Sequence, residues 1–281
     1  MTSPLLLLRR LSRPLDPLPT GVNPRLVPLE GIRGVVFDVY GTLVVSASGD
    51  IGVSDAPQKE AALRSILRDL AVNPPPGDGR LTDRLTALIK NDHLRARAAG
   101  IDYPEVEIRD IWRSLLGLDD DDLVNAVAVA YEAVTNPVWP MPAAAGLLAG
   151  LRARRFLLGI VSNAQFYTPL LFDALFGASL DRLGFDPGLS FFSYQHRRAK
   201  PGLWLFQQLR EALPARQLDP SAILYVGNDA LKDIHPAASL GFRTALFAGD
   251  QRSYRPRPET PGLLPPDAIL TRLSQIPQLI N

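Results

Sequence analysis

The sequence contains no cysteine, which excludes a disulfide framework, a thiolate zinc site and a cysteine nucleophile. It has almost no net charge, formally +1 at pH 7, which argues against a dedicated nucleic-acid-binding protein. Long apolar runs are also missing, because Leu5 to Leu8 is too short for a signal-peptide core or a membrane span. We therefore expect a cytoplasmic protein with neither a nucleic acid nor a membrane as its partner.

Lysine is scarce, because most of the basic residues are arginine. The chain has only four lysines, at positions 59, 90, 200 and 232. In such a chain a lysine is less often a chance surface residue. Lys200 is therefore a candidate for a specific role. The other bulk properties are ordinary for a globular protein, with 46% hydrophobic and 21% charged residues. A length of 281 residues allows one large domain or two smaller ones.

Residues 1–31 are rich in proline, leucine and arginine. Six prolines between Pro4 and Pro28 exclude a long helix here. We expect an extended N-terminal arm that lies on the surface of the protein.

The chain is organised around the stretch from Val35 to Leu43. The apolar run Val35 to Phe37 predicts a strand buried on both faces, as in a parallel sheet covered by helices. Asp38 follows this strand directly, at the end where such sheets bind their ligands. Gly41 allows a sharp turn beside it. Taken alone, Asp38 could equally be a residue that caps the end of a strand.

Further strands are predicted at residues 156–161, near 189–193, at 223–226 and at 244–247, with helical segments between them. This alternation indicates an α/β fold with a parallel sheet and right-handed crossovers. The sequence places this core in residues 32–45 and 136–281. Residues 46–135 show helical periodicity without a clear strand, and we expect them to form an all-helical insertion.

Polar residues follow the predicted strands in a fixed order. Each has an ordinary explanation by itself: Ser162 as a helix cap, Lys200 as a surface residue, and Asp229 with Asp233 as the first turn of a helix. In a parallel sheet, however, the carboxyl ends of the strands lie at one edge. We therefore expect these side chains to lie near Asp38.

The stretch Asp38-Val39-Tyr40-Gly41-Thr42-Leu43 resembles the first motif of the haloacid dehalogenase superfamily. The four polar signals match the motif order of that family across about residues 32–250. The resemblance implies a Rossmann-like core, a helical cap domain inserted after the first motif, and Asp38 as a nucleophile. A cap excludes water and supplies substrate contacts.

In the phosphatase form of this family, Asp38 would attack phosphorus and form an aspartyl-phosphate that water hydrolyses. Catalysis would then depend on positioning and charge neutralisation. Two acids beside Asp38, with Lys200 as the recognised cation, would repel one another unless Mg²⁺ were bound. The phosphate ligands implied are Thr42, Ser162, Asn163 and Lys200. The implied metal ligands are Asp38, the backbone carbonyl of Tyr40, Asp229 and Asp233.

Tyr40 departs from the phosphatase pattern, which has a second aspartate there as general acid. With Asp38 and Lys200, Tyr40 is the third candidate catalytic residue, but a tyrosine with an ordinary pKa near 10 is a poor acid for this purpose. Dehalogenases of the family have tyrosine here. They displace halide from carbon, and they need no metal.

Three hypotheses follow from the resemblance. The first is a Mg²⁺-dependent phosphatase acting on a phosphorylated small molecule. The second is a metal-independent 2-haloacid dehalogenase with an ester intermediate on Asp38. The third is a member with impaired chemistry that serves as a binding or regulatory protein. The cap decides the substrate, and its Tyr103-Pro104-Glu105 turn and Trp112 are expected to shape it. The sequence leaves open the natural substrate and the oligomeric state, a homodimer included.

Overall fold

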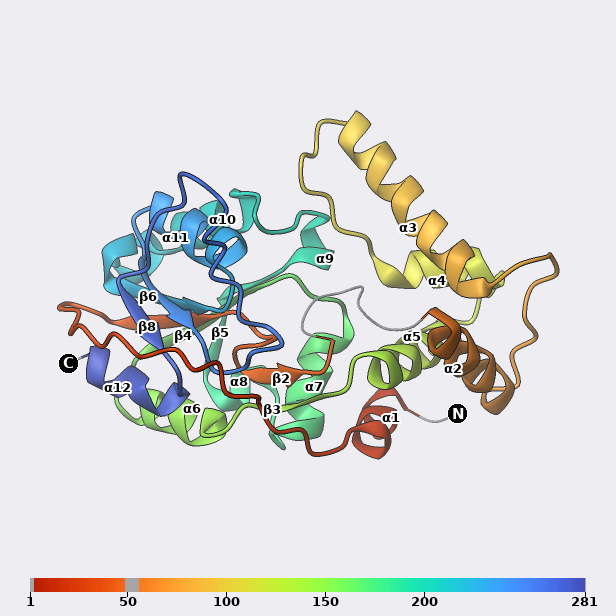
Figure 1. The fold of residues 1–281 in the computed structure, drawn as a ribbon, viewed down its shortest axis with the longest axis horizontal. Helices are drawn as coiled ribbons and strands as arrows, with labels where there is room; N and C mark the ends of the chain where they lie inside the picture. Colours follow the sequence, from red (N-terminus) through yellow and green to blue (C-terminus); the bar gives the residue numbers. More distant parts are fainter. Residues whose placement is uncertain (1–2, 49–55, 281) are drawn as a thin grey trace.

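A six-stranded sheet forms the core of the computed structural model, which describes residues 3–48 and 56–280 (Figure 1). The strands pair in the order β5-β4-β1-β6-β7-β8, and every pairing is parallel. The predicted α/β class is therefore confirmed. The strands are β1 (Gly34–Phe37), β4 (Leu157–Ser162), β5 (Phe185–Phe192), β6 (Ile223–Gly227), β7 (Arg243–Phe247) and β8 (Ala268–Leu270).

Strand β1 lies in the interior of the sheet, and all four of its residues are buried. Phe37 is level with Ile160 of β4 and with Val226 of β6. The residues that follow these three strands are consequently brought to one edge of the sheet. This register places Asp38 between the ends of its two neighbouring strands.

Helices cover both faces of the sheet. One apolar cluster contains Phe37 together with residues of α6, α7 and α12, and the other contains Val36 together with residues of α10 and α11. Figure 1 shows α6 and α12 on one side of the sheet and α10 and α11 on the other. The core helices are α6 (Ala144–Ala153), α7 (Tyr167–Leu175), α8 (Leu180–Leu183), α9 (Ser193–His196), α10 (Trp204–Ala212), α11 (His235–Ser239) and α12 (Ile276–Leu279).

Four short turns of other helical type complete the core: η1 (Pro214–Arg216), η2 (Pro220–Ala222), η3 (Ala230–Ile234) and η4 (Leu273–Gln275). The turn η3 is π-helical and leads directly into α11. It is wide because the amide of Ile234 reaches back five residues to the carbonyl of Asp229. Single π-helical turns occur often at functional sites.

The chain leaves the core for the expected insertion through β2 (Val44–Ser46) and returns through β3 (Val138–Pro140), which pair antiparallel. Between them lie α2 (Ala56–Asp69), α3 (Leu81–Ala98), α4 (Ile108–Leu116) and α5 (Asp121–Thr135), beside the sheet in Figure 1. The helical cap is thus present, although residues 49–55 of the expected cap lie outside the described residues. We propose the division expected from the sequence, with the cap at 46–135.

The cap helices enclose an apolar cluster of their own, in which Trp112 is buried and meets Tyr131 edge-on at 5.2 Å. Helix α5 begins where Asp120 accepts hydrogen bonds from the amides of Asp122 and Leu123, as its acidic start predicts. Its Val127 belongs to the cap cluster, but its Ala126 and Val129 belong to the main core. Helix α5 therefore joins cap and core.

The sequence predicts an extended arm over residues 1–31. This is wrong at Pro4–Leu11, which form the helix α1. Its leucines form an apolar face, and Leu7 and Leu8 are buried where α1 contacts α5 and α7. Pro4 is tolerated because it stands in the first turn, where its missing N–H would have no helical partner. Beyond α1 the chain is largely extended, and Arg25 pairs with Ile269 at the edge strand β8. Among the described residues, no helix has the length and apolarity needed to cross a bilayer.

Candidate active site

Asp38 lies at the carboxyl end of β1, and its backbone amide donates to the carbonyl of Val226 at 2.9 Å. The turn that follows requires glycine at position 41. Gly41 has a positive φ of 76°, and a Cβ there would lie 2.5 Å from the Cβ of Ser253. The spacing of Asp38 and Gly41 thus reflects a tight turn that holds the carboxylate at the rim of the sheet.

Lys200 is the electrostatic centre of the site. Its buried Nζ lies 2.9 Å from Oδ1 of Asp38 and 2.5 Å from Oδ1 of Asp233, and it also donates to Tyr225 and to the carbonyl of Val161, both at 3.1 Å. Burial lowers the pKa of Lys200, but the two carboxylates outweigh it, so that the pKa lies above its ordinary value. Burial and the charge of Asp38 in turn raise the pKa of Asp233.

The structure thus brings together Asp38, Lys200 and Asp233, as the sequence predicts. Tyr225 was not predicted as part of this group. Its hydroxyl donates to the carbonyl of Val161 and bonds Asp233, and burial raises its pKa. A tyrosine in the otherwise apolar strand Ile223–Gly227 is the signal that could have identified it, because a buried hydroxyl needs a partner.

Three predicted substrate ligands are engaged with the protein itself. Thr42 donates to the side chain of Asn228 at 3.2 Å. The Asn163 side chain donates to the Lys200 carbonyl at 3.0 Å and accepts from the Lys200 amide at 2.8 Å. Ser162 is fully buried and makes a long bond of 3.4 Å to the carbonyl of Asn163. In this arrangement Asn163 positions the segment that carries Lys200.

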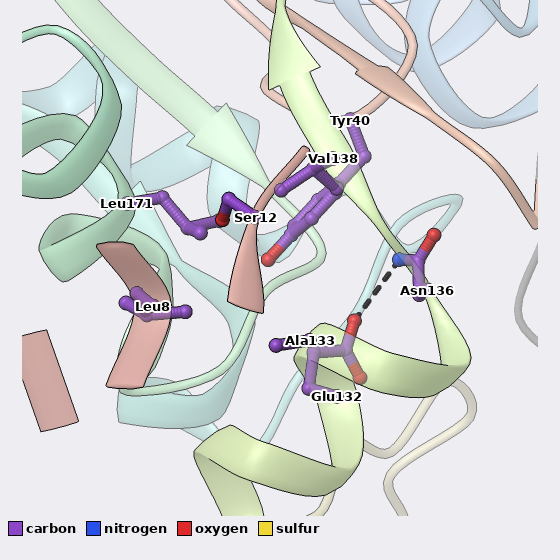
Figure 2. A pocket seen from close by; sticks show the side chains of 8 residues that line it. All are labelled: Leu8, Ser12, Tyr40, Glu132, Ala133, Asn136, Val138 and Leu171. Atoms are coloured by element: carbon purple, nitrogen blue, oxygen red, sulfur yellow. Dashed lines mark hydrogen bonds between the residues drawn. The ribbon is translucent and has the colours of Figure 1, made fainter. Parts of the chain in front are cut away.

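The hydroxyl of Tyr40 is bound elsewhere and is poorly suited to act as a general acid. Its hydroxyl bonds Thr168 of α7 at 2.8 Å, and its side chain lines a small cavity with residues from α1, α5 and β3, including Leu8, Glu132 and Val138 (Figure 2). Burial and the carboxyl group of Glu132 raise the pKa of Tyr40 above its ordinary value. The hydroxyl is therefore bound to a neighbour and holds its proton tightly.

Asp229 is paired with a cation that the sequence did not reveal. Arg257 donates to Oδ1 of Asp229 from Nε at 3.3 Å and to Oδ2 from Nη2 at 2.7 Å. The Oδ1 atom also accepts from the amides of Leu231 and Lys232, and so caps η3. Burial raises the pKa of Asp229, but the bonds from Arg257 and the two amides outweigh it, so that the pKa lies below its ordinary value.

The arrangement does not fit the Mg²⁺ that the phosphatase resemblance implies. Both oxygens of Asp229 are bound by protein donors. The same holds for Asp233, whose Oδ2 accepts from the amide of Asp229 at 2.9 Å while its Oδ1 faces Lys200. In the described part of the chain, no three acidic or histidine side chains converge as metal ligands would. We therefore derive no step through a metal ion.

What remains available at the site is the second carboxylate oxygen of Asp38. Nζ of Lys200 lies 2.9 Å from Oδ1, whereas within residues 3–48 and 56–280 no hydrogen bond is donated to Oδ2. The side chain of Asp38 keeps 12% of its surface exposed. A carboxylate held in place by a buried cation, with one oxygen unengaged, can act as a nucleophile.

Comparisons with known proteins bear on the family and the fold. The sequence matches the profile of a family described as haloacid dehalogenase-like hydrolase over residues 32–241. A search of curated proteins finds no match.

Among solved structures, one similar protein is a 2-haloacid dehalogenase from Pseudomonas syringae pv. tomato DC3000, with a TM-score of 0.55 and 24% identity over 88% of this chain and 97% of that one. Another is an L-2-haloacid dehalogenase from Xanthobacter autotrophicus, with a TM-score of 0.50 and 21% identity over 88% and 98% of the two chains. A third, described as a predicted phosphoglycolate phosphatase from Haemophilus somnus 129PT, has a TM-score of 0.49 and 19% identity over 88% and 97%. At these identities the likeness concerns the fold.

Proposed function

The chain belongs to the haloacid dehalogenase-like hydrolases, and from that premise we propose that it displaces halide from a small 2-haloacid through an ester on Asp38, without a metal. This is the second of the three hypotheses that the sequence raised. It ranks first here because the side chains around Asp38 suit it better than phosphoryl transfer.

The main support for the proposal is that donors of the protein already bind the carboxylates of Asp229 and Asp233. Phosphoryl transfer places a highly charged group beside a carboxylate and depends on cations that neutralise it. In this site Lys200 and Arg257 are already bound to carboxylates of the protein. A haloacid brings a single negative charge, and its halide departs with the bonding electrons and needs no proton. The reaction therefore needs fewer added cations than phosphoryl transfer does.

Tyr40 supports the same choice. An alcohol that leaves phosphorus needs a proton, which an acid must supply. The Tyr40 hydroxyl is bonded to Thr168, and its pKa is raised, so it is unsuited to that task. A halide ion leaves carbon without being protonated.

The proposed reaction has two steps. An oxygen of Asp38 forms a bond to C2 of the haloacid, while the carbon–halogen bond breaks and halide departs with the bonding electrons. Water then attacks the carbonyl carbon of the ester, which releases the 2-hydroxy acid and restores the carboxylate. The proton lost by water ends in the solvent. Lys200 holds Asp38 in position throughout, because its Nζ lies 2.9 Å from Oδ1.

A single-turnover reaction in ¹⁸O-labelled water tests the proposal. With excess enzyme and 2-chloropropionate in the presence of EDTA, we expect halide release, ¹⁸O in the Asp38 carboxylate and ¹⁶O in the product hydroxyl. Direct attack of water on C2 would instead place ¹⁸O in the product. Asp38→Asn is the control and should release no halide.

Parallel assays with an aryl phosphate, with and without Mg²⁺, compare the other hypotheses. Phosphate release that depends on Mg²⁺, without halide release, would contradict the proposal in favour of the phosphatase. A folded protein that releases neither product would contradict it in favour of a binding or regulatory role.

A further inference from the structure

An extended segment of the cap lies along the core segment that leads to Lys200. The amide of Ala199 donates to the carbonyl of Tyr103 at 2.8 Å, and the amide of Glu105 donates to the carbonyl of Arg197 at 3.2 Å. Pro104 and Arg198 form an antiparallel bridge between these two bonds. The cap is thus joined by backbone hydrogen bonds to the residues immediately before Lys200.

The side chain of Glu105 strengthens this junction. Its Oε2 accepts from Ser193 Oγ at 2.8 Å, and its Oε1 accepts from the Val106 amide at 3.0 Å and from Gln165 Nε2 at 3.3 Å. Ser193 begins α9, which follows β5, and Gln165 follows β4. One carboxylate from the cap therefore binds residues at the ends of two core strands.

Hydrogen bonds, together with the peptide bond between Asn163 and Ala164, connect Glu105 to Lys200. Ser193 Oγ accepts from the amide of Ala164 at 2.9 Å, and Ala164 directly follows Asn163. The side chain of Asn163 binds both the amide and the carbonyl of Lys200. Any shift of Glu105 must therefore be accommodated by the residues that fix the backbone of Lys200.

We infer that Glu105 is a positioning residue that couples the cap to the segment carrying Lys200 and so keeps Nζ beside Asp38. In this arrangement the cap covers the site and also supports the backbone that carries Lys200. When Glu105 leaves Ser193, the segment 197–200 loses its outer support. This inference does not depend on which bond the site cleaves.

The scarcity of lysine makes the inference testable without an activity assay. An amine reagent such as trinitrobenzenesulfonate, followed by mass spectrometry, reports the reactivity of each lysine in the intact protein. Lys200 is buried, whereas Lys90 is exposed on α3 and serves as the internal reference. In the wild type we expect Lys200 to react far more slowly than Lys90.

Glu105→Ala should raise the labelling rate of Lys200 by at least ~10-fold, because it removes several partly buried hydrogen bonds and favours local opening. Glu105→Gln should restore a rate near that of the wild type. Its amide oxygen can still accept from Val106 and Gln165, and the Ser193 hydroxyl can accept from its NH₂ group. The labelling of Lys90 should not change in either variant.

Glu107→Ala is the matched control. Glu107 is an acid of the same cap segment, but its bonds go to Arg109 within the cap, with Oε2 2.7 Å from Nη2. We expect it to leave the rate of Lys200 unchanged, even if it loosens α4. If Glu107→Ala raised the rate as much as Glu105→Ala, general cap stability would explain the effect and the inference would fail.

Ser193→Ala is the second variant, should Glu105→Ala not fold. It removes the hydroxyl between Glu105 and Ala164 while leaving the carboxylate in place, and it should raise the Lys200 rate in the same direction. Wild-type labelling of Lys200 in a folded Ser193→Ala protein would also overturn the inference. Circular dichroism establishes that each variant is folded.

Discussion

Two cations of the site perform different tasks. Lys200 lies beneath the strand ends with 2% of its side chain exposed, and it contacts both the proposed nucleophile Asp38 and the buried Asp233. Arg257 belongs to the proline-rich loop after β7, keeps 26% of its side chain exposed, and holds Asp229 from outside. Lys200 supports the proposed nucleophile Asp38, and Arg257 fixes Asp229.

The difference shows how two cations of the protein can neutralise the carboxylates of Asp38, Asp233 and Asp229. A buried ion pair is costly to break, because the remaining charge is left in a medium of low dielectric constant. The pair of Arg257 and Asp229 should be less costly to break, because Arg257 is partly exposed and Asp229 keeps the hydrogen bonds from the amides of Leu231 and Lys232. The two sides should therefore respond very differently to loss of their cation.

The largest effect is expected for Lys200→Met. Asp38 and Asp233 would lose their shared cation, and we expect a loss of about 3–5 kcal/mol in the free energy of unfolding, with loss of activity. Urea unfolding measures it, and Lys90→Met, at an exposed position, should change stability by less than about 0.5 kcal/mol. Adding Asp233→Asn to Lys200→Met should recover part of the loss. A variant as stable as the wild type would refute the central place of Lys200.

Arg257→Gln should have a smaller effect on stability, about 1–3 kcal/mol, because Asp229 has only 6% of its side chain exposed. The response of this variant to Mg²⁺ is more informative than its loss of stability. Asp229 would then lack its cation, while Lys200 stays bound to Asp38 and Asp233, and a carboxylate without a cation is an oxygen ligand that Mg²⁺ can bind. We expect Mg²⁺ to raise the melting temperature of this variant by about 2–4 °C and to leave the wild type unchanged.

Arg216→Gln is the matched control for Arg257→Gln. Arg216 also binds an aspartate through two nitrogens, at 2.6 and 2.8 Å from Asp186. That aspartate is 24% exposed and lies on β5, and Arg216 lies on η1, so the pair is outside the site. Mg²⁺ should not affect this variant. A melting temperature that responded to Mg²⁺ equally in the wild type would contradict the account of Arg257.

Tyr40→Phe tests whether the hydroxyl takes part in the chemistry. It removes the bond to Thr168 and should cost about 1 kcal/mol in stability, with turnover within about twofold of the wild type. A large fall in kcat at unchanged stability would return Tyr40 to the reacting group. Tyr40→Asp, which the sequence suggests as a way to supply the missing acid, places a carboxylate near Glu132, and we expect no gain in phosphatase activity from it.

The parts of the site that the sequence predicts are those fixed by the sheet. Asp38 and Lys200 could be expected to meet because parallel strands end at one edge. Arg257 could not, because its loop has no periodicity and only the folded chain brings it to Asp229. The orientation of Tyr40 escaped prediction for a similar reason. It depends on α1 and α5, and the prolines around α1 obscured its apolar face.

The smallest effect is expected for the ion pair of Asp186 and Arg216, the control used above. The bonds from Arg216, with a further bond from the amide of Gly188, lower the pKa of Asp186 below its ordinary value. A carboxyl group whose pKa is lower in the folded state stabilises the protein above its unfolded pKa, and this contribution disappears as the pH falls through the folded pKa. Asp186→Asn should therefore cost up to about 1 kcal/mol at neutral pH and less at a pH below the ordinary carboxyl pKa of about 3.9. Urea unfolding at the two pH values measures this difference, and a cost that stayed constant with pH would show that packing, not charge, accounts for the pair.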